Sequence, residues 1–137
     1  MTKPDRSYVL ETTTGPDTLD AIQRTLDEVW SEHELPELVR IHMDLAASEI
    51  GANIVEHSGD GQPVRLRMEV RLLPDVVEAT FTDDGHPSPV DLTSIGMPDE
   101  MSERGRGLAI AHRVLDELSY RRDENGNHWI LLRRRNA

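Results

Sequence analysis

The sequence predicts an α+β fold with two layers, in which helices cover one face of a mixed, mostly antiparallel sheet. Apolar residues recur every three to four positions in three segments, as in amphipathic helices, and alternate with polar residues in others, as in strands. Neighbouring strand segments are joined by short turns, in the overall order β-α-α-β-β-loop-α-β-β. The 137 residues match the length of one domain, so we expect a single domain over 1–137.

The N-terminal part begins with a predicted edge strand and an amphipathic helix. Ser7–Glu11 indicates the strand, and the Thr, Gly and Pro turn after it ends at Asp17, a candidate helix N-cap. One apolar stripe then predicts a helix from Thr18 to about Glu34. Pro36 interrupts this pattern, so the first helix ends before it.

A second, longer helix is predicted from Pro36 to about His57. Proline suits the first turn of a helix because its missing N–H has no helical partner there. We expect Glu49 and Asn53 on the face opposite to the apolar one. We assign the buried face to the apolar residues Leu38, Ile41, Leu45, Ala52 and Val55.

The remaining elements complete the predicted sheet. Apolar and polar residues alternate along Val64–Arg71, which predicts a half-buried strand. The next strand, Val76–Thr82, is more apolar, and the turn at Leu73-Pro74-Asp75 joins the two strands in an antiparallel hairpin. No sustained period appears between Gly85 and Gly105, which predicts a long loop of the kind that is often functional. A helix from Gly105-Arg106-Gly107 to Leu118 follows. The last predicted strands, Ser119–Arg122 and His128–Arg133, are joined through Asn125-Gly126.

Charge and composition exclude several classes of function. Fifteen Lys and Arg against 26 Asp and Glu give a net charge of −11, which disfavours binding to nucleic acid. The absence of Cys excludes disulfides and thiolate metal sites. No apolar run approaches the roughly 20 residues that span a bilayer, and no signal peptide is evident. We therefore expect a cytoplasmic protein without a membrane partner.

Three motifs could carry chemistry. Glu49 and Asn53 stand four apart on a helix, where their oxygens could serve a general base and a hard cation, although such a pair is also common on a solvated face. Asp83 follows a strand and precedes Gly85, which suits either recognition of an exocyclic amine or an ordinary Asp-Gly turn. The glycines of Gly105-Arg106-Gly107 open a helix whose N–H groups could bind an anion, or they form a flexible hinge.

In this order, the motifs resemble the Bergerat-type ATP-binding fold of the gyrase, Hsp90, histidine-kinase and MutL (GHKL) superfamily. The stretch from Arg104-Gly105-Arg106-Gly107-Leu108 through Asp116 to Tyr120, and then Gly126-Asn127, looks most like the anti-sigma-factor serine kinases of partner-switching systems. The resemblance spans nearly the whole chain. It implies a two-layer α/β sandwich that binds ATP and Mg²⁺.

The resemblance also assigns roles to individual residues. Glu49 matches the general base, Asn53 the magnesium ligand, and Asp83, with Gly85 beside it, the adenine-binding aspartate. The sequence departs from many members in Pro87, where they have a second glycine, and in Gly126-Asn127, where they have a Gly-Thr pair. The residues that match the phosphate-binding end of an ATP lid at about 88–104 are Arg104, Gly105, Arg106, Gly107 and Leu108.

The implied function is a serine/threonine-protein kinase that phosphorylates a STAS-domain antagonist. By the same resemblance it sequesters a sigma factor or another regulatory target and forms a homodimer. The alternative is an ATP-binding module that acts by sequestration only, which the presence of Glu49 disfavours because a pure binder needs no base. A third alternative, the catalytic half of a histidine kinase, is disfavoured because no helix pair with a phosphoacceptor histidine precedes the domain.

Overall fold

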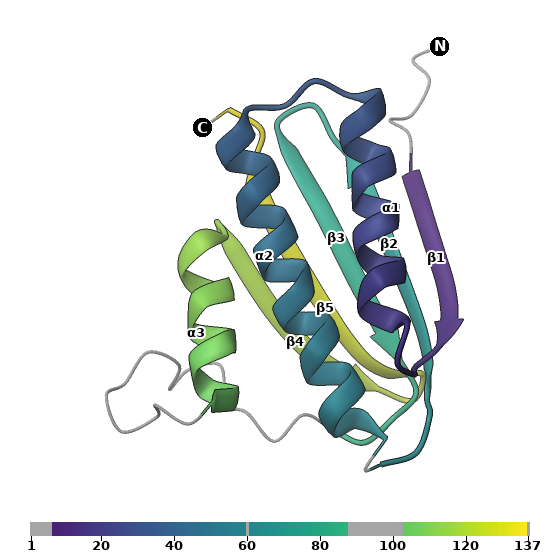
Figure 1. The fold of residues 1–137 in the computed structure, drawn as a ribbon. Coiled ribbons are helices and arrows are strands. Elements are labelled where there is room, and N and C mark those ends of the chain that lie inside the picture. Colours follow the sequence, from purple (N-terminus) through teal and green to yellow (C-terminus); the bar gives the residue numbers. More distant parts are fainter. Residues whose placement is uncertain (1–6, 60, 88–102, 137) are drawn as a thin grey trace.

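The computed structural model describes residues 7–59, 61–87 and 103–136, with side chains in the last range from Leu108 onward. Five strands form one sheet in the order β1-β2-β3-β5-β4, and the helices cover one of its faces (Figure 1). This confirms the predicted two-layer α+β fold. The strands are β1 (Ser7–Thr13), β2 (Arg65–Leu72), β3 (Val76–Asp83), β4 (Glu117–Asp123) and β5 (Gly126–Arg134). The helices are α1 (Thr18–Glu32), α2 (Glu37–Asn53), the π-helix η1 (Ile54–Ser58) and α3 (Glu103–Val114).

Alternation along the strands builds the core. In β2 and β3, every second side chain is buried against the helices, as the sequence pattern predicts. Every pairing among the described strands is antiparallel, so the parallel pair of a mixed sheet does not occur among them. The large buried side chains on the helix side of the sheet include Met68, Leu72, Phe81, Trp129 and Leu131.

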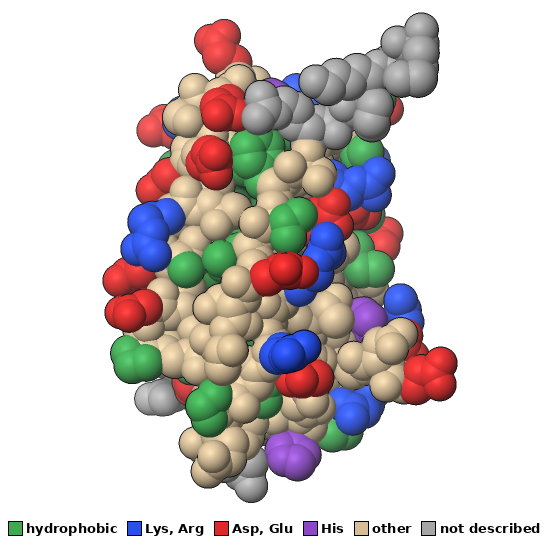
Figure 2. Space-filling model, turned by 90° about the vertical axis from the view of Figure 1, so that its right-hand side faces the viewer, with side chains coloured by type: hydrophobic (Ala, Val, Ile, Leu, Met, Phe, Trp, Pro, Cys, Tyr) green, Lys and Arg blue, Asp and Glu red, His purple; other side chains and the backbone are tan. Residues whose placement is uncertain are grey.

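The other face of the sheet carries charged side chains that pair within β2 and with the neighbouring strands. Arg67 contacts Glu11 at 3.3 Å and Glu69 at 3.2 Å, and Arg71 contacts Glu78 at 3.3 Å. Pairs this exposed contribute little stability, but they keep an uncovered sheet face polar. Figure 2 shows the side of the molecule formed by α1 and β1, where acidic side chains are scattered over the surface.

The face of α2 that packs on the core is not the predicted one. The core residues of this helix are Val39, Met43, Ala46, Ala47 and Ile50, whereas Leu38, Ile41 and Leu45 are exposed and Ala52 and Val55 only partly buried. Small residues let the helix approach its neighbours closely. A Cβ on Gly51 would lie 2.6 Å from a methyl carbon of Ile22 in α1. The prediction assigned the wrong one of two apolar stripes to the core.

The third helix also differs from its prediction. It begins at Glu103, before the glycines, and ends at Val114, so Leu118 lies in β4 rather than in the helix. Asp116 brings the chain into the sheet at this point, because its backbone N–H donates to the Leu132 carbonyl at 2.9 Å. The carboxylate of Asp116 accepts a hydrogen bond from the Arg134 N–H at 2.7 Å. These bonds fix the start of β4 earlier than the apolar spacing indicates.

His42 links α2 to β5 and makes stability depend on pH. The Arg133 Nε donates to its Nδ1 at 3.1 Å. Burial and the Arg133 charge lower the pKa of His42 from 6.5, and Asp116 partly opposes them. Below about pH 6.5 the unfolded chain therefore takes up a proton that the folded chain resists. The free energy of unfolding should fall as the pH drops through this value, and should level off below the folded-state pKa.

We expect His42→Gln to weaken this pH dependence, because glutamine can still accept the Arg133 hydrogen bond but does not titrate. Urea unfolding of both proteins between about pH 7.5 and about pH 5.5 measures the difference. The same change in unfolding free energy with pH in both proteins would contradict the prediction.

Candidate functional site

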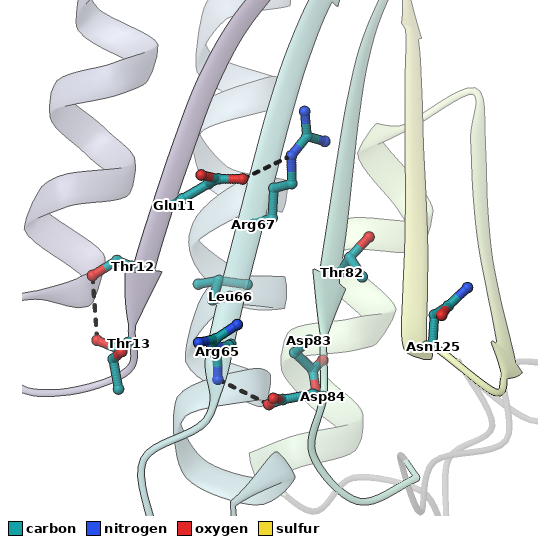
Figure 3. Close-up of a pocket in the computed structure, with 10 residues that line it drawn as sticks. All are labelled: Glu11, Thr12, Thr13, Arg65, Leu66, Arg67, Thr82, Asp83, Asp84 and Asn125. Carbon is teal, nitrogen blue, oxygen red and sulfur yellow. Dashed lines mark hydrogen bonds and ion pairs between the residues drawn. The ribbon is translucent and has the colours of Figure 1, made fainter.

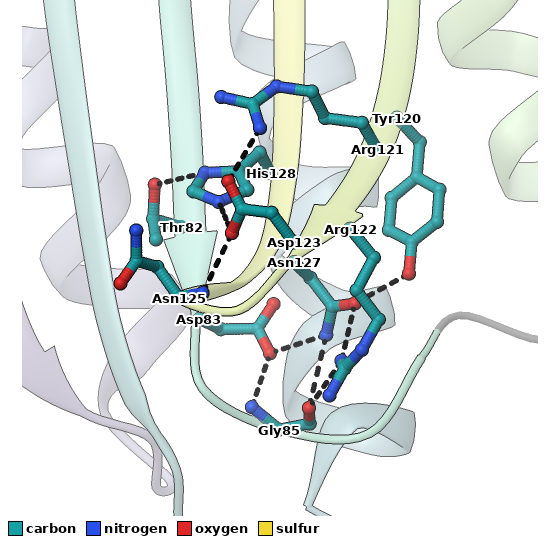
Figure 4. Close-up of polar contacts among 10 residues, drawn as sticks. All are labelled: Thr82, Asp83, Gly85, Tyr120, Arg121, Arg122, Asp123, Asn125, Asn127 and His128. Atoms are coloured by element: carbon teal, nitrogen blue, oxygen red, sulfur yellow. Dashed lines mark hydrogen bonds and ion pairs between the residues drawn. The ribbon is translucent and has the colours of Figure 1, made fainter.

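The candidate site lies where β3 ends beside the start of β5. Asp83, the last residue of β3, pairs in register with Asn127 of β5, and each is only 1% exposed (Figure 4). Burying a carboxylate and a carboxamide this deeply is unfavourable unless their polar atoms find partners. The partners of these two side chains therefore define the site.

The Asp83 carboxylate has one bonded and one free oxygen. Its Oδ1 accepts hydrogen bonds from the Gly85 N–H and from the Asn127 Nδ2, both at 2.9 Å. Its Oδ2 is buried and has no hydrogen-bond partner among the described residues. A buried acceptor without a donor is rare, because a missing hydrogen bond to a buried polar atom costs about 1–3 kcal/mol of stability. The arrangement fits a ligand that brings an N–H donor, such as an exocyclic amine.

Asn127 holds Asp83 and the following loop in one network (Figure 4). Its Nδ2 also donates to the His86 carbonyl at 2.6 Å. Its Oδ1 accepts from the Tyr120 hydroxyl and, at 3.0 Å, from Arg122. The guanidinium of Arg122 reaches the Gly85 carbonyl as well, at 2.8 Å. The Asn127 amide is thereby fully engaged, so it orients Asp83 rather than offering a free group to a ligand.

This network is not predicted from the sequence, in which Gly126-Asn127 is only a departure from a Gly-Thr pair and Tyr120 and Arg122 have no assigned role. The available signal was that departure, since a polar residue still stands where the threonine is expected. The partners of Asn127 follow from the antiparallel register of β4 and β5, in which Arg122 lies opposite Asn127.

Two glycines allow backbones to meet closely here. Gly126 has φ +119°, a conformation that favours glycine, and a Cβ on it would lie 2.1 Å from the Asp83 carbonyl oxygen. A Cβ on Gly85 would lie 2.3 Å from the Ser58 carbonyl oxygen, which also accepts a 2.6 Å hydrogen bond from the His86 N–H. The loop after β3 is therefore held between β5 and the end of η1.

Glu49 and Asn53 lie one turn apart on α2, directly before η1. Asn53 is 7% exposed. Its burial corrects the expectation that both residues face away from the core; Glu49 is partly exposed. π-helical segments such as η1 are rare and occur frequently at functional sites. Through the Ser58 and His86 contact, η1 connects this helix to the Asp83 loop.

The predicted phosphate-binding residues fall largely beyond what the structure describes. Residues 88–102 of the predicted lid lie outside the described residues, as do the side chains of Arg104 and Arg106. Gly105 is among the first four residues of α3, whose backbone N–H groups lack helical partners, whereas Gly107 is the fifth residue of the helix. Leu108 is 1% exposed and belongs to the core.

A cavity opens on the uncovered face of the sheet, and Asp83 and Asp84 are among the residues that line it (Figure 3). Its volume is ≈ 540 Å³, and it includes neither Glu49 nor Asn53. Arg67 pairs with Glu11 in this cavity, and the Asp84 carboxylate accepts a hydrogen bond from the backbone N–H of Arg65 at 2.9 Å. The described residues hold no cluster of three or more His, Asp or Glu side chains that could bind a metal.

The β4–β5 turn is fixed by a second polar cluster. The His128 Nε2 lies 2.8 Å from Asp123, whose other oxygen accepts from Arg121 at 2.7 Å. The Asn125 N–H also donates to this carboxylate at 2.8 Å. These bonds, those of His128 and Arg121 above all, hold the pKa of Asp123 well below its usual range. These bonds fix the conformation of the β4–β5 turn, and Arg122 and Asn127 of the site lie on the two strands that it joins.

The family of the chain gives the class of this domain, which is of the ATPase type. Residues 12–133 match the family described as histidine kinase-like ATPase domain, and the chain belongs to this family. The match covers every described strand and helix in whole or in part. None of the described helices is long and apolar enough to cross a membrane.

Two solved structures share the fold. One is the crystal structure of the RsbU and RsbW domains of Rv1364c from Mycobacterium tuberculosis, with 18% identity, a TM-score of 0.60 and coverage of 92% of this chain and 32% of that one. The other is the histidine kinase domain from the Erythrobacter litoralis EL346 blue-light activated histidine kinase, with 16% identity, a TM-score of 0.53 and coverage of 86% and 61%. This chain therefore spans less than two thirds of either. A comparison with curated proteins finds no match.

We expect Asp83→Asn to abolish recognition of an amine donor while keeping the local fold. The carboxamide oxygen can replace Oδ1 in the bonds from Gly85 and Asn127, which turns the free Oδ2 into an N–H₂ donor. Titration with a fluorescent ATP analogue should show affinity reduced by about tenfold or more. Asp84→Asn is the matched control, because it removes the same charge from the adjacent residue, and it should bind ATP like the wild type. Equal binding by both variants would contradict the assignment.

We expect Asn127→Ala to lower the free energy of unfolding by about 2–3 kcal/mol, since it leaves several buried polar partners unsatisfied. Tyr120→Phe, which removes a single donor from the same network, should lower it by about 1 kcal/mol. Urea unfolding measures both values. A smaller effect of Asn127→Ala than of Tyr120→Phe would mean that Asn127 is not the centre of the network.

Proposed function

We propose that this protein is an ATP-dependent serine-protein kinase of a partner switch. It phosphorylates a STAS-domain antagonist and sequesters a sigma factor or another regulatory target, acting as a cytoplasmic homodimer. The family match supports an ATP-binding kinase or ATPase domain. The motifs from Glu49 to Asn127 and the RsbW domain in the first similar structure support the partner-switch assignment.

One observation carries the nucleotide assignment: the buried Oδ2 of Asp83 has no donor among the described residues. The 6-amino group of adenine is such a donor and is flat enough to enter beside Gly85. The Asn127 network keeps the acceptor oriented before the base arrives. Orientation fixed in advance reduces the entropy lost on binding, which favours affinity.

Asn53 and Glu49 are the residues we assign to the phosphates and the reaction. The Asn53 amide supplies an oxygen ligand without positive charge, as Mg²⁺ requires. Bound Mg·ATP supplies the phosphoryl group and the charge that neutralises its oxygens. Glu49, one turn earlier and partly exposed, can accept the proton of a serine hydroxyl from a docked partner. Backbone N–H groups at the start of α3 suit the binding of phosphate oxygens.

We expect Glu49→Gln to reduce phosphoryl transfer by about 100-fold or more and to leave ATP affinity unchanged, because the change removes a base but no nucleotide contact. The assay follows label from γ-labelled ATP to the STAS protein encoded nearest to this chain. The control is Glu56→Gln, which removes a carboxylate from η1, directly after α2; the Glu56 side chain is 65% exposed.

The outcomes separate the proposal from its alternative. Transfer by wild type and Glu56→Gln but not by Glu49→Gln supports the kinase and the base together. Saturable ATP binding without transfer by any of the three would favour a module that acts by sequestration only. Absence of ATP binding would contradict both.

A further inference from the structure

An apolar ridge runs along the outward face of α2. It consists of Leu38, Ile41 and Leu45, which are 48%, 50% and 37% exposed. Their spacing of three and four aligns them in one stripe about 10 Å long. Among the described residues only two other large apolar side chains are as exposed, Val9 and Leu19, and neither belongs to α2. The exposed apolar surface is therefore concentrated on this α2 ridge.

A groove between α1 and α2 borders the ridge and is predominantly acidic. Its volume is ≈ 370 Å³, and Ile41 of the ridge forms part of its wall. Three carboxylates line it against one guanidinium, that of Arg40, whose Nε is buried without a hydrogen-bond partner among the described residues. The Trp30 indole N–H donates to the Asp44 carboxylate at 2.8 Å, which fixes an aromatic wall. The carboxylates are those of Asp27, Glu37 and Asp44.

We propose that the α2 ridge and this groove dock a basic amphipathic helix of a partner protein. Such a helix would lay its apolar side chains on the ridge and place Lys or Arg against the groove carboxylates, the common mode of helix recognition by an apolar surface with charged borders. A second copy of this chain fits poorly. A twofold axis through the ridge would bring the acidic borders of two chains of net charge −11 together, over a narrow stripe.

The α2 ridge ends four residues before Glu49, about 6 Å along the helix axis, so it adjoins the residue assigned as the base and lies farther from the Asp83 end of the site. Leu38 and Leu45 precede Asn53 by fifteen and eight residues on the same helix, which corresponds to about 22 Å and about 12 Å along its axis. A partner held at the ridge therefore leaves the Asp83 end of the molecule open. This inference goes beyond the proposed phosphoryl transfer, and its test needs no nucleotide.

The test uses a fluorescein-labelled model peptide of about 20 residues, with Leu in an amphipathic heptad pattern and Lys on its flanks. A second peptide replaces every Lys with Glu. Fluorescence anisotropy should show that the Lys peptide binds at least about tenfold more tightly than the Glu peptide. The Leu38→Gln/Ile41→Gln/Leu45→Gln variant should bind the Lys peptide at least about tenfold more weakly than the wild type, and glutamine suits an exposed helix position, so the fold is kept.

Val9→Thr, which removes an apolar group of similar exposure from β1, is the matched control and should bind like the wild type. Circular dichroism of the triple variant checks that the helix is intact. Equal affinity for both peptides, or unchanged binding by the triple variant, would overturn the proposal. So would light scattering that shows a wild-type dimer and a monomeric triple variant, because a second copy would then cover the ridge.

Discussion

The candidate site depends on how closely the start of β5 approaches the end of β3. Gly126 lies against the Asp83 carbonyl with no room for a side chain, and this contact brings the Asn127 amide within hydrogen-bond distance of the Asp83 carboxylate. Because Gly85 and Asn127 both donate to Oδ1 of Asp83, the direction of its Oδ2 is fixed as well. The polar geometry of the site is thus a consequence of backbone packing between two strands.

Most of the fold follows from local sequence patterns, because alternation along β2 and β3 and the turns between strands constrain the chain over a few residues. The buried face of α2 does not follow from them. That helix has two apolar stripes, one of Leu and Ile and one of Val, Met, Ala and Ile. Which stripe is buried depends on how closely the helix approaches its neighbours; Ala46 and Ala47 are fully buried, and Gly51 lies against Ile22 of α1.

For the site, the sequence predicts single residues better than their interactions. Asp83 and Gly85 stand out as a strand end followed by glycine, and the structure places them together at the buried acceptor. The roles of Glu49 and Asn53 rest on the resemblance and stay predictions. Tyr120, Arg122 and Asn127 converge only after β4 and β5 pair, so no spacing along the chain reveals them.

The strand order has a further consequence for the folding of this domain. β2 with β3 and β4 with β5 are hairpins of nearby residues, whereas pairing β3 with β5 joins Asp83 to a residue 44 positions away. Joining the two hairpins therefore costs more loop-closure entropy than forming either of them. The buried acceptor does not exist before that step. A ligand that binds it stabilises the long-range topology of the sheet and leaves the separate hairpins unaffected.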